Sequence, residues 1–152
     1  MTLRTRLIVA AGLVWLDSGR ILVQRRPDRA PHGGGLLELP GGKVEPGEAP
    51  SSALERELLE EWGPEASALR VGRIADVLHH VYPGPEEPEI VLCIYHVDAR
   101  AWADDWQQRV LLEPGAGVEA HRLDALPVDA FLAADRRFLA ALVGGEIRSP
   151  FD

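Results

Sequence analysis

The sequence predicts an α/β fold, in which β-strands and two amphipathic α-helices share one chain of 152 residues. Residues 6–16 (RLIVAAGLVWL) form an apolar run that favours a strand buried on both faces for much of its length. Residues 51–62 and 129–143 instead space their apolar side chains at helical intervals. Because the length suits a single core and the composition is ordinary for a globular protein, we expect one domain over residues 1–152.

The first half of the chain is predicted to hold a hairpin, a loop, a short strand, a turn and a helix. In order these are strand 6–16, turn 17–19, strand 21–24, loop 28–35, strand 36–39, turn 40–42 and helix 51–62. Asp17-Ser18-Gly19 is a typical turn sequence. Gly63 and Pro64 end the helix because neither residue favours its continuation.

The second half is predicted to hold three strands and the second helix. In order these are strand 69–82, turn 83–88, strand 89–99, a long connection over 100–117, a weak strand 118–123, helix 129–143 and tail 144–152. The expected core contacts of the second helix are Phe131, Leu132, Phe138, Leu139 and Leu142. No repeat, low-complexity segment or interdomain linker interrupts this order.

Charge and apolar patterning exclude several classes of protein. The formal net charge of −8 argues against binding to long nucleic acid, which requires a basic surface, but it permits a small nucleotide held through metal ions. The single cysteine, Cys93, excludes an intramolecular disulfide framework. No signal-peptide pattern is present, and the apolar runs are far shorter than the roughly 20 residues of a membrane span. We therefore expect a cytoplasmic protein without membrane attachment, either a monomer or a homodimer.

Three glutamates in helix 51–62 carry the first functional signal. Glu57, Glu60 and Glu61 have the spacing i, i+3, i+4, which places them in one sector of the helix. Like charges at this spacing repel by about 0.2–0.5 kcal/mol per pair, and a bound cation would reverse that sign. They border the apolar stripe, so a purely solvated face explains them less well than a partner such as Arg56 or a metal ion. Hard divalent ions favour clustered carboxylates beside phosphates, so we predict a metal site with phosphate chemistry.

Other polar residues leave alternatives open. Arg25 and Arg26 end a strand, where they either face solvent or contact a phosphate or a nucleobase. His32 in the following loop is interpreted as a surface residue or a substrate contact. The histidines of the later strands, His79, His80 and His96, lack a ligand spacing, which argues against zinc.

Residues 41–64, GGKVEPGEAPSSALERELLEEWGP, resemble the signature box of the Nudix hydrolases. The box positions are filled by Gly42, Glu48, Arg56, Glu57, Leu58, Glu60, Glu61 and Gly63. Pro64 departs from the pattern, at a packing position where an aliphatic residue is usual. The order of elements also resembles this family, which implies a Nudix-type α/β/α sandwich around a mixed β-sheet.

The resemblance implies metal-dependent hydrolysis of a nucleoside diphosphate linked to another group. Mg²⁺ or Mn²⁺ would be held by Glu57, Glu60, Glu61 and the carbonyl of Gly41. Arg56 would orient Glu57 through a charge-assisted hydrogen bond, and Glu48 would be an auxiliary ligand. The general base would be a box glutamate, Glu57 or Glu61, or a carboxylate on a later loop, for which Glu113 is the best placed.

The segment around the box resembles the MutT-type branch, which removes pyrophosphate from nucleoside triphosphates, including oxidised dGTP. The substrate contacts that this branch implies are Arg26, His32, Glu38, Leu39, Pro40, Tyr82 and Asp135. Asp135 stands where the branch has an asparagine that reads the purine, and an ionised carboxylate accepts hydrogen bonds but does not donate them. Asp135 is therefore either a base-reading residue or an exposed helix residue.

Three rival interpretations remain. Tyr82, eighteen residues after Pro64, fits a dinucleoside polyphosphate hydrolase. Hydrolases of nucleotide sugars or ADP-ribose favour a proline at about the position where this chain has Leu78 and His79. A non-catalytic nucleotide-binding module would usually lose box glutamates, whereas this chain keeps them. Catalysis is the stronger prediction.

Overall fold

The computed structural model describes residues 4–151, which contain a mixed sheet of seven strands. The strands are β1 (Arg6–Asp17), β2 (Arg20–Arg25), β3 (Leu37–Glu38), β4 (Gly41–Lys43), β5 (Arg70–Val81), β6 (Glu89–Asp98) and β7 (Gly117–Arg122). Their spatial order is β3-β2-β1-β6-β5, while β4 pairs with β1 and β7 pairs with β2. Strands β1 and β6 run parallel, and the other pairs run antiparallel.

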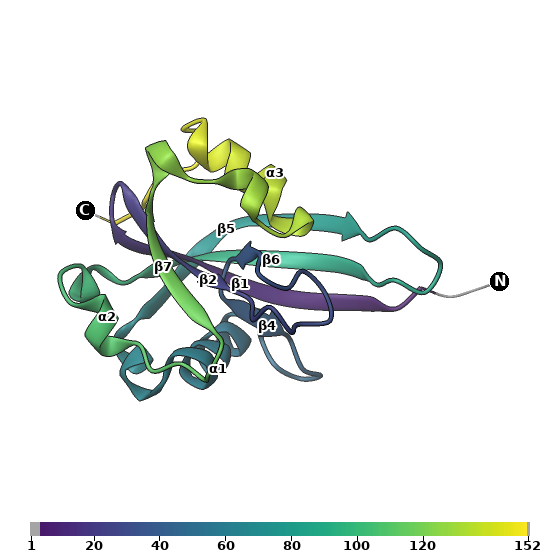
Figure 1. The fold of residues 1–152 in the computed structure, drawn as a ribbon, viewed down its shortest axis with the longest axis horizontal. Coiled ribbons are helices and arrows are strands. Elements are labelled where there is room, and N and C mark those ends of the chain that lie inside the picture. Colours follow the sequence, from purple (N-terminus) through teal and green to yellow (C-terminus); the bar gives the residue numbers. More distant parts are fainter. Residues whose placement is uncertain (1–3, 152) are drawn as a thin grey trace.

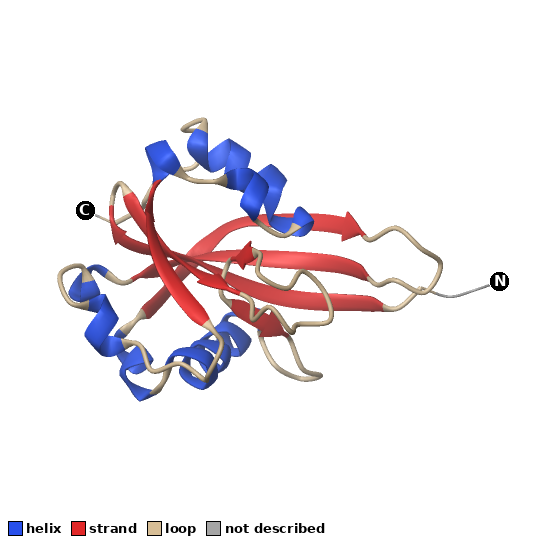
Figure 2. Ribbon diagram, viewed as in Figure 1, coloured by secondary structure: helices blue, strands red, loops and turns tan. Residues whose placement is uncertain are grey.

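Helices cover both faces of this sheet, as Figures 1 and 2 show. The α-helices are α1 (Pro50–Trp62), α2 (Trp106–Arg109) and α3 (Ala133–Val143), and the 3₁₀ turns are Pro64–Ala68, Arg100–Trp102, Leu123–Ala125 and Val128–Ala130. One core lies between α1 and the sheet and includes Leu54, Leu58 and Trp62. The other core lies beneath α3 and includes Phe138 and Leu139. The predicted α/β/α sandwich with a mixed sheet is therefore confirmed.

The central strand β1 shows why the sequence forms this sandwich. Its residues Ala10–Leu16 are buried on both faces, as the unbroken apolar run predicts for a strand that pairs in parallel beneath two layers. Helix α1 begins at Pro50, whose missing N–H costs nothing in the first turn. It ends at Gly63, whose φ of 91° is a conformation that favours glycine.

The structure corrects two predicted boundaries. The predicted turn at residues 40–42 contributes to a strand, β4, in which Gly42 pairs with Ala10 and Gly41 pairs with Ala11. A Cβ atom on Gly41 would lie 2.0 Å from the carbonyl oxygen of Ala10, so this approach requires glycine. Helix α3 begins at Ala133, not at residue 129, because the preceding segment makes an isolated bridge to β3.

Within residues 4–151 no helix is both long and apolar enough to cross a lipid bilayer.

A buried histidine gives the core a testable pH dependence. His96 is 4% exposed, and its Nδ1 accepts a hydrogen bond from Nε1 of Trp15 at 3.0 Å. The ring of Phe151 packs edge-on against His96. Burial, reinforced by the positive charge of Arg73, lowers the pKa of His96 below its usual value of 6.5.

We expect the folded protein to lose stability as the pH falls below about 6.5, because the unfolded chain then binds a proton that the buried His96 resists. The loss continues down to the lowered pKa of His96 in the fold. Asparagine at this position keeps an acceptor near Nδ1 and does not titrate. Thermal unfolding between pH 8 and pH 5 should therefore fall less steeply for His96→Asn than for the parent. Parallel curves would exclude His96 as the source.

Candidate functional site

A cleft of 470 Å³ gathers most of the predicted site residues. Three parts of the chain meet there: the carboxylates of α1, the end of β2 with β3 and β4, and the loop before β7. The lining residues are Gln24, Arg25, Arg26, Pro27, Glu38, Gly41, Gly42, Glu57, Glu60, Glu61, Leu112, Glu113 and Ala116. The three glutamates that the helical spacing placed in one sector therefore face a common cavity, together with Glu113.

Arg56 organises the acidic side of this cleft. Its Nε and Nη2 donate to the two carboxylate oxygens of Glu48 at 2.8 and 3.0 Å, and its Nη1 donates to Glu57 at 3.0 Å. Nη1 also lies 3.3 Å from Glu60, and Nη2 donates to the carbonyl of Lys43. The hydrogen bonds from Arg56 lower the pKa of Glu48 to about 2, so this carboxylate is ionised throughout the physiological range.

Glu61 lies deeper than the other two glutamates of the cluster. Its Oε2 is buried and has no hydrogen-bond partner within residues 4–151. Burial, together with the nearby charges of Glu57 and Glu38, raises the pKa of Glu61 to about 8. Hydrogen bonds from Gln24 and the Gly41 backbone oppose that shift and are outweighed. A buried carboxylate with an unpaired oxygen is the group that gains most from a bound cation.

Gly42 leaves room for the carboxylate of Glu57. A Cβ atom at this position would lie 2.4–2.6 Å from the carboxylate carbon and oxygens of Glu57. Its φ is not in the left-handed region, so the requirement for glycine is one of space and not of backbone conformation. The glycine and the glutamate of the signature box are therefore matched in space, although they lie on different elements.

The donor set fits a hard divalent cation. As the side chains stand, no group of three or more His, Cys, Asp or Glu residues within residues 4–151 is arranged to hold one ion. One cause is visible: Arg56 pairs with both Glu57 and Glu60. Three carboxylates on the cleft wall and the unpaired oxygen of Glu61 supply the oxygen ligands that magnesium and manganese prefer. Glu60 would have to turn away from Arg56 to join them.

A second polar cluster lies where β3 meets the start of α3. Asp135 is 5% exposed, so its interpretation as an exposed helix residue is wrong. Its Oδ2 accepts a hydrogen bond from the backbone N–H of Leu39 at 3.2 Å, and burial raises the pKa of Asp135 to about 7. Arg26 pairs with Glu38 at 2.8 Å, and the pKa of the buried Glu38 is raised by desolvation. Burial and the charge of Asp135 raise the pKa of Tyr82, which places Tyr82 near the same cluster.

The remaining predicted residues divide between the two clusters and the surface. Pro40 is buried directly before β4, and its carbonyl accepts from the backbone N–H of Gly12. His32 is exposed and does not line the cleft, although its carbonyl accepts a hydrogen bond from Nε of Arg26 at 2.8 Å. Arg25, one of the arginine pair, also forms an ion pair with Glu119.

Sequence reasoning missed Gln24. This side chain lines the cleft, accepts a hydrogen bond from Nε1 of Trp62 at 2.9 Å and contributes a hydrogen bond to Glu61. The available signal was a polar residue that follows three apolar ones in strand 21–24. Such a residue suggests a site when its partners are known, and those partners lie on another element.

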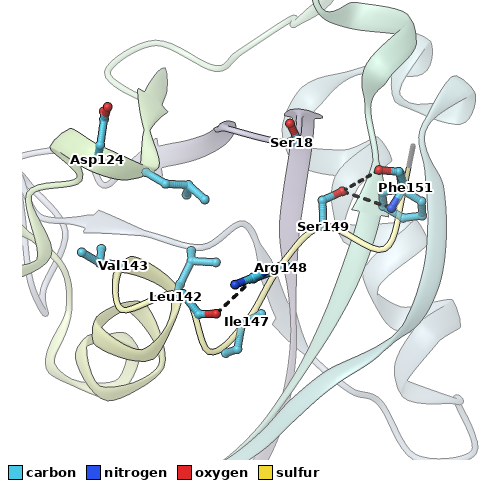
Figure 3. Close-up of a pocket in the computed structure, with 10 residues that line it drawn as sticks. Ser18, Asp124, Leu142, Val143, Ile147, Arg148, Ser149 and Phe151 are labelled. Atoms are coloured by element: carbon cyan, nitrogen blue, oxygen red, sulfur yellow. Dashed lines mark hydrogen bonds between the residues drawn. The ribbon is translucent and has the colours of Figure 1, made fainter.

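A larger hollow of 590 Å³ lies at the C-terminal end of α3, and Figure 3 shows the side chains that line it. Its polar groups are already engaged with the nearby backbone: Arg148 donates to the carbonyl of Gly145, and the hydroxyl of Ser149 bonds to the backbone of Phe151. None of the predicted site residues lines it. The acidic cleft is therefore the candidate site.

Comparison with known proteins agrees with this geometry. The family model described as NUDIX domain matches residues 5–142. An 8-oxo-dGTP diphosphatase of Proteus vulgaris is 35% identical over 80 residues, which cover 53% of this chain and 68% of that protein. A CTP pyrophosphohydrolase of Escherichia coli K12 is 48% identical over 59 residues, covering 39% of this chain and 42% of that protein.

The solved structures show the same fold over a longer span. The MutT protein from Methanosarcina mazei Go1 superposes with a TM-score of 0.69 at 21% identity, covering 94% of this chain and 96% of that one. The sequence alignments are shorter, and they span less than half the length of the curated relatives other than the Proteus protein. Because the family model matches nearly the whole chain and the curated relatives include 8-oxo-dGTP diphosphatases, the chain belongs to the Nudix family as a MutT-like hydrolase.

Proposed function

We propose that this protein is a nucleoside triphosphate pyrophosphohydrolase that splits (d)NTPs into a nucleoside monophosphate and pyrophosphate. The observation that carries the proposal is the acidic cleft, in which Arg56 orders Glu48 and Glu57 while Glu61 keeps a buried unpaired oxygen. The names of its curated relatives, diphosphatases and a pyrophosphohydrolase of nucleotides, support the same reaction class. Oxidised nucleotides are candidate substrates.

Each residue of the cleft has a proposed part in this reaction. Divalent metal, which Nudix hydrolases generally need, would supply positive charge for the diphosphate oxygens and activate water; Mg²⁺ is the proposed ion, with Mn²⁺ as a substitute. Glu57, Glu60, Glu61 and the Gly41 carbonyl would hold it. Arg56 keeps the carboxylate of Glu57 in place at 3.0 Å.

The proton of the attacking water requires a base within the cleft. Glu113 faces the α1 carboxylates from the loop before β7, so we propose it as the acceptor, with Glu57 and Glu61 as the alternatives. The pairing of Glu57 with Arg56 favours a carboxylate that stays charged and binds cations, which leaves Glu113 the freer of the two to accept a proton.

The base of the nucleotide would bind at the second cluster, formed by Arg26, Glu38, Leu39, Tyr82 and Asp135. Near neutral pH Asp135 is present in both protonation states, because burial raises its pKa to about 7. A protonated carboxyl both donates and accepts hydrogen bonds, as the asparagine amide of the MutT-type pattern does. Asp135 can therefore replace that amide. Pro40 and His32 are proposed to border this pocket.

Replacing Asp135 should change the ranking of bases more than the rate on a good substrate. We expect Asp135→Ala to alter the ratio of kcat/KM between purine substrates by about tenfold or more, because it removes a buried hydrogen-bonding group. Asp135→Asn is the matched control, since its amide oxygen can still accept from Leu39 N–H. If Asp135→Ala ranks the bases as the parent does, Asp135 plays no part in base recognition.

A substrate panel tests the proposed function. The four dNTPs, oxidised dGTP, a dinucleoside polyphosphate and ADP-ribose would each be incubated with Mg²⁺, and pyrophosphate and phosphate would be measured separately. The proposal predicts pyrophosphate from at least one triphosphate. Preferential cleavage of the dinucleoside polyphosphate or of ADP-ribose would assign the chain to a rival branch. Tight binding of all of these compounds without turnover would identify a non-catalytic module.

A further inference from the structure

The α1 side of the sheet carries a cluster of exposed apolar side chains. The strand register places Ile8 beside Val91 and Val77 beside Cys93, on the same face as Ala10, which packs beneath α1. Large apolar side chains here are 43–54% exposed, and they are Ile8, Leu59, Ile74, Val77 and Val81. Val91, Cys93 and Tyr95 are half-buried among them. We call this set of residues the open face.

The open face exists because α1 covers only part of its side of the sheet. Leu54 of α1 lies over Gly12, whereas β1, β5 and β6 continue well beyond the helix towards the N-terminus, as Figure 2 shows. A groove of 560 Å³, lined by Leu58, Leu59 and Val71 among others, joins the flank of α1 to β5. Contiguous exposed apolar patches of this kind mark interaction surfaces on water-soluble folds.

Strand β5 favours contact through this face and disfavours contact through its edge. It is the outer strand of the described sheet, so its far side is available for pairing. However, its register is broken twice, between Val71 and Ile74 and between Ile74 and Asp76. Such irregularities twist an edge away from a regular strand partner. The apolar side chains, which point out of the sheet, are the part of β5 suited to bind.

The charges at the two ends of the open face are complementary to one another. At one end Arg6 pairs with Glu89, which also lies 3.7 Å from His79. At the other end Glu55 and Arg70 line the groove beside α1. Each end therefore has both signs, and the centre between them is apolar. A two-fold axis that crosses the strands would bring Glu55 opposite Arg6, and Arg70 opposite Glu89, of a second copy.

We propose that two copies of this chain form a homodimer by packing their open faces against each other. An isologous contact requires a surface that complements itself, and the apolar centre with mixed charges at both ends meets that requirement. Three strands about 4.8 Å apart and about eight residues long give a footprint of roughly 25 by 15 Å. This is at the small end for a specific interface, so the dimer is weak and depends on concentration.

Sedimentation velocity from about 1 µM to several hundred µM tests the dimer, because this range brackets a weak association. The parent should shift from monomer to dimer as its concentration rises. Val77→Glu places a charge at the centre and should raise the dissociation constant by about tenfold or more. Val143→Glu is the matched control: Val143 is 47% exposed but belongs to α3, and its variant should dimerise as the parent does.

A charge exchange tests the proposed arrangement. Glu55→Arg should weaken the dimer by repelling Arg6 of the second copy, and adding Arg6→Glu should restore it. Thermal unfolding of each variant confirms that the fold is kept. A parent that stays monomeric throughout the range, or a dimer that is indifferent to Val77→Glu, overturns the proposal and leaves the open face to another partner. A double variant no better than Glu55→Arg overturns the two-fold arrangement.

Discussion

Glu61→Gln should lower turnover by at least about a hundredfold, because removing a metal-binding charge costs several kcal/mol of transition-state stabilisation. The same change should leave the metal-free fold at least as stable as the parent. Oε2 of Glu61 is buried without a hydrogen-bond partner in the described chain, so a neutral amide costs less to bury than the carboxylate. Glu57→Gln should also lower turnover, and it additionally weakens the pairing with Arg56.

Two measurements separate loss of the site from loss of the fold. The first is kcat with a good triphosphate substrate, and the second is the rise in Tm that Mg²⁺ produces. For Glu61→Gln both should fall, while the Tm without metal stays equal or rises. Glu55→Gln, on the exposed side of the same helix, is the matched control and should retain turnover and the Mg²⁺ effect. If Glu57→Gln and Glu61→Gln both keep full Mg²⁺-dependent activity, the site has been assigned wrongly.

Gly42→Ala should lower turnover by about a hundredfold although it adds a single methyl group. The new Cβ would lie 2.4–2.6 Å from the carboxylate of Glu57, so that carboxylate must move away. Arg56 anchors Glu57 on the other side, and displacement of a catalytic group by about 1 Å can cost a hundredfold. The change should appear in kcat and in the metal concentration needed for half-maximal rate.

Gly19→Ala provides the control for this substitution. Gly19 lies in the β1–β2 turn, has no left-handed φ and would place its Cβ 3.8 Å from the nearest atom, an oxygen of Asp17. It should therefore retain activity. Equal rates for Gly42→Ala and the parent would mean that Glu57 does not occupy its position during catalysis.

The chemistry of the site was readable from the sequence because it is concentrated on one helix. The positions of Glu57, Glu60 and Glu61 relative to each other follow from helical spacing alone, and the structure places all three on the cleft. Strand β1 was equally readable, because a strand covered on both faces is apolar throughout. In both cases the pattern and its structural cause lie within one continuous element.

Features that depend on contacts between distant elements were not readable. Strand β4 has only three residues, two of them glycines, and forms because β1 offers it hydrogen bonds. The burial of Asp135 depends on Leu39, which is far away in the chain. The start of α3 shifts to Ala133 because Leu132 donates to the carbonyl of Leu37. The open face is likewise visible only when the extent of α1 over the sheet is known.

The central claim is that the acidic cleft cleaves a nucleoside triphosphate so that pyrophosphate leaves intact. The most direct measurement is the product balance when dGTP or oxidised dGTP is hydrolysed by the parent protein with Mg²⁺. We predict one pyrophosphate for each nucleoside monophosphate, with no diphosphate nucleotide and no orthophosphate in the initial phase, and no reaction when the metal is chelated. Release of orthophosphate with a nucleoside diphosphate, or hydrolysis that persists with chelator or in Glu61→Gln, would contradict the account.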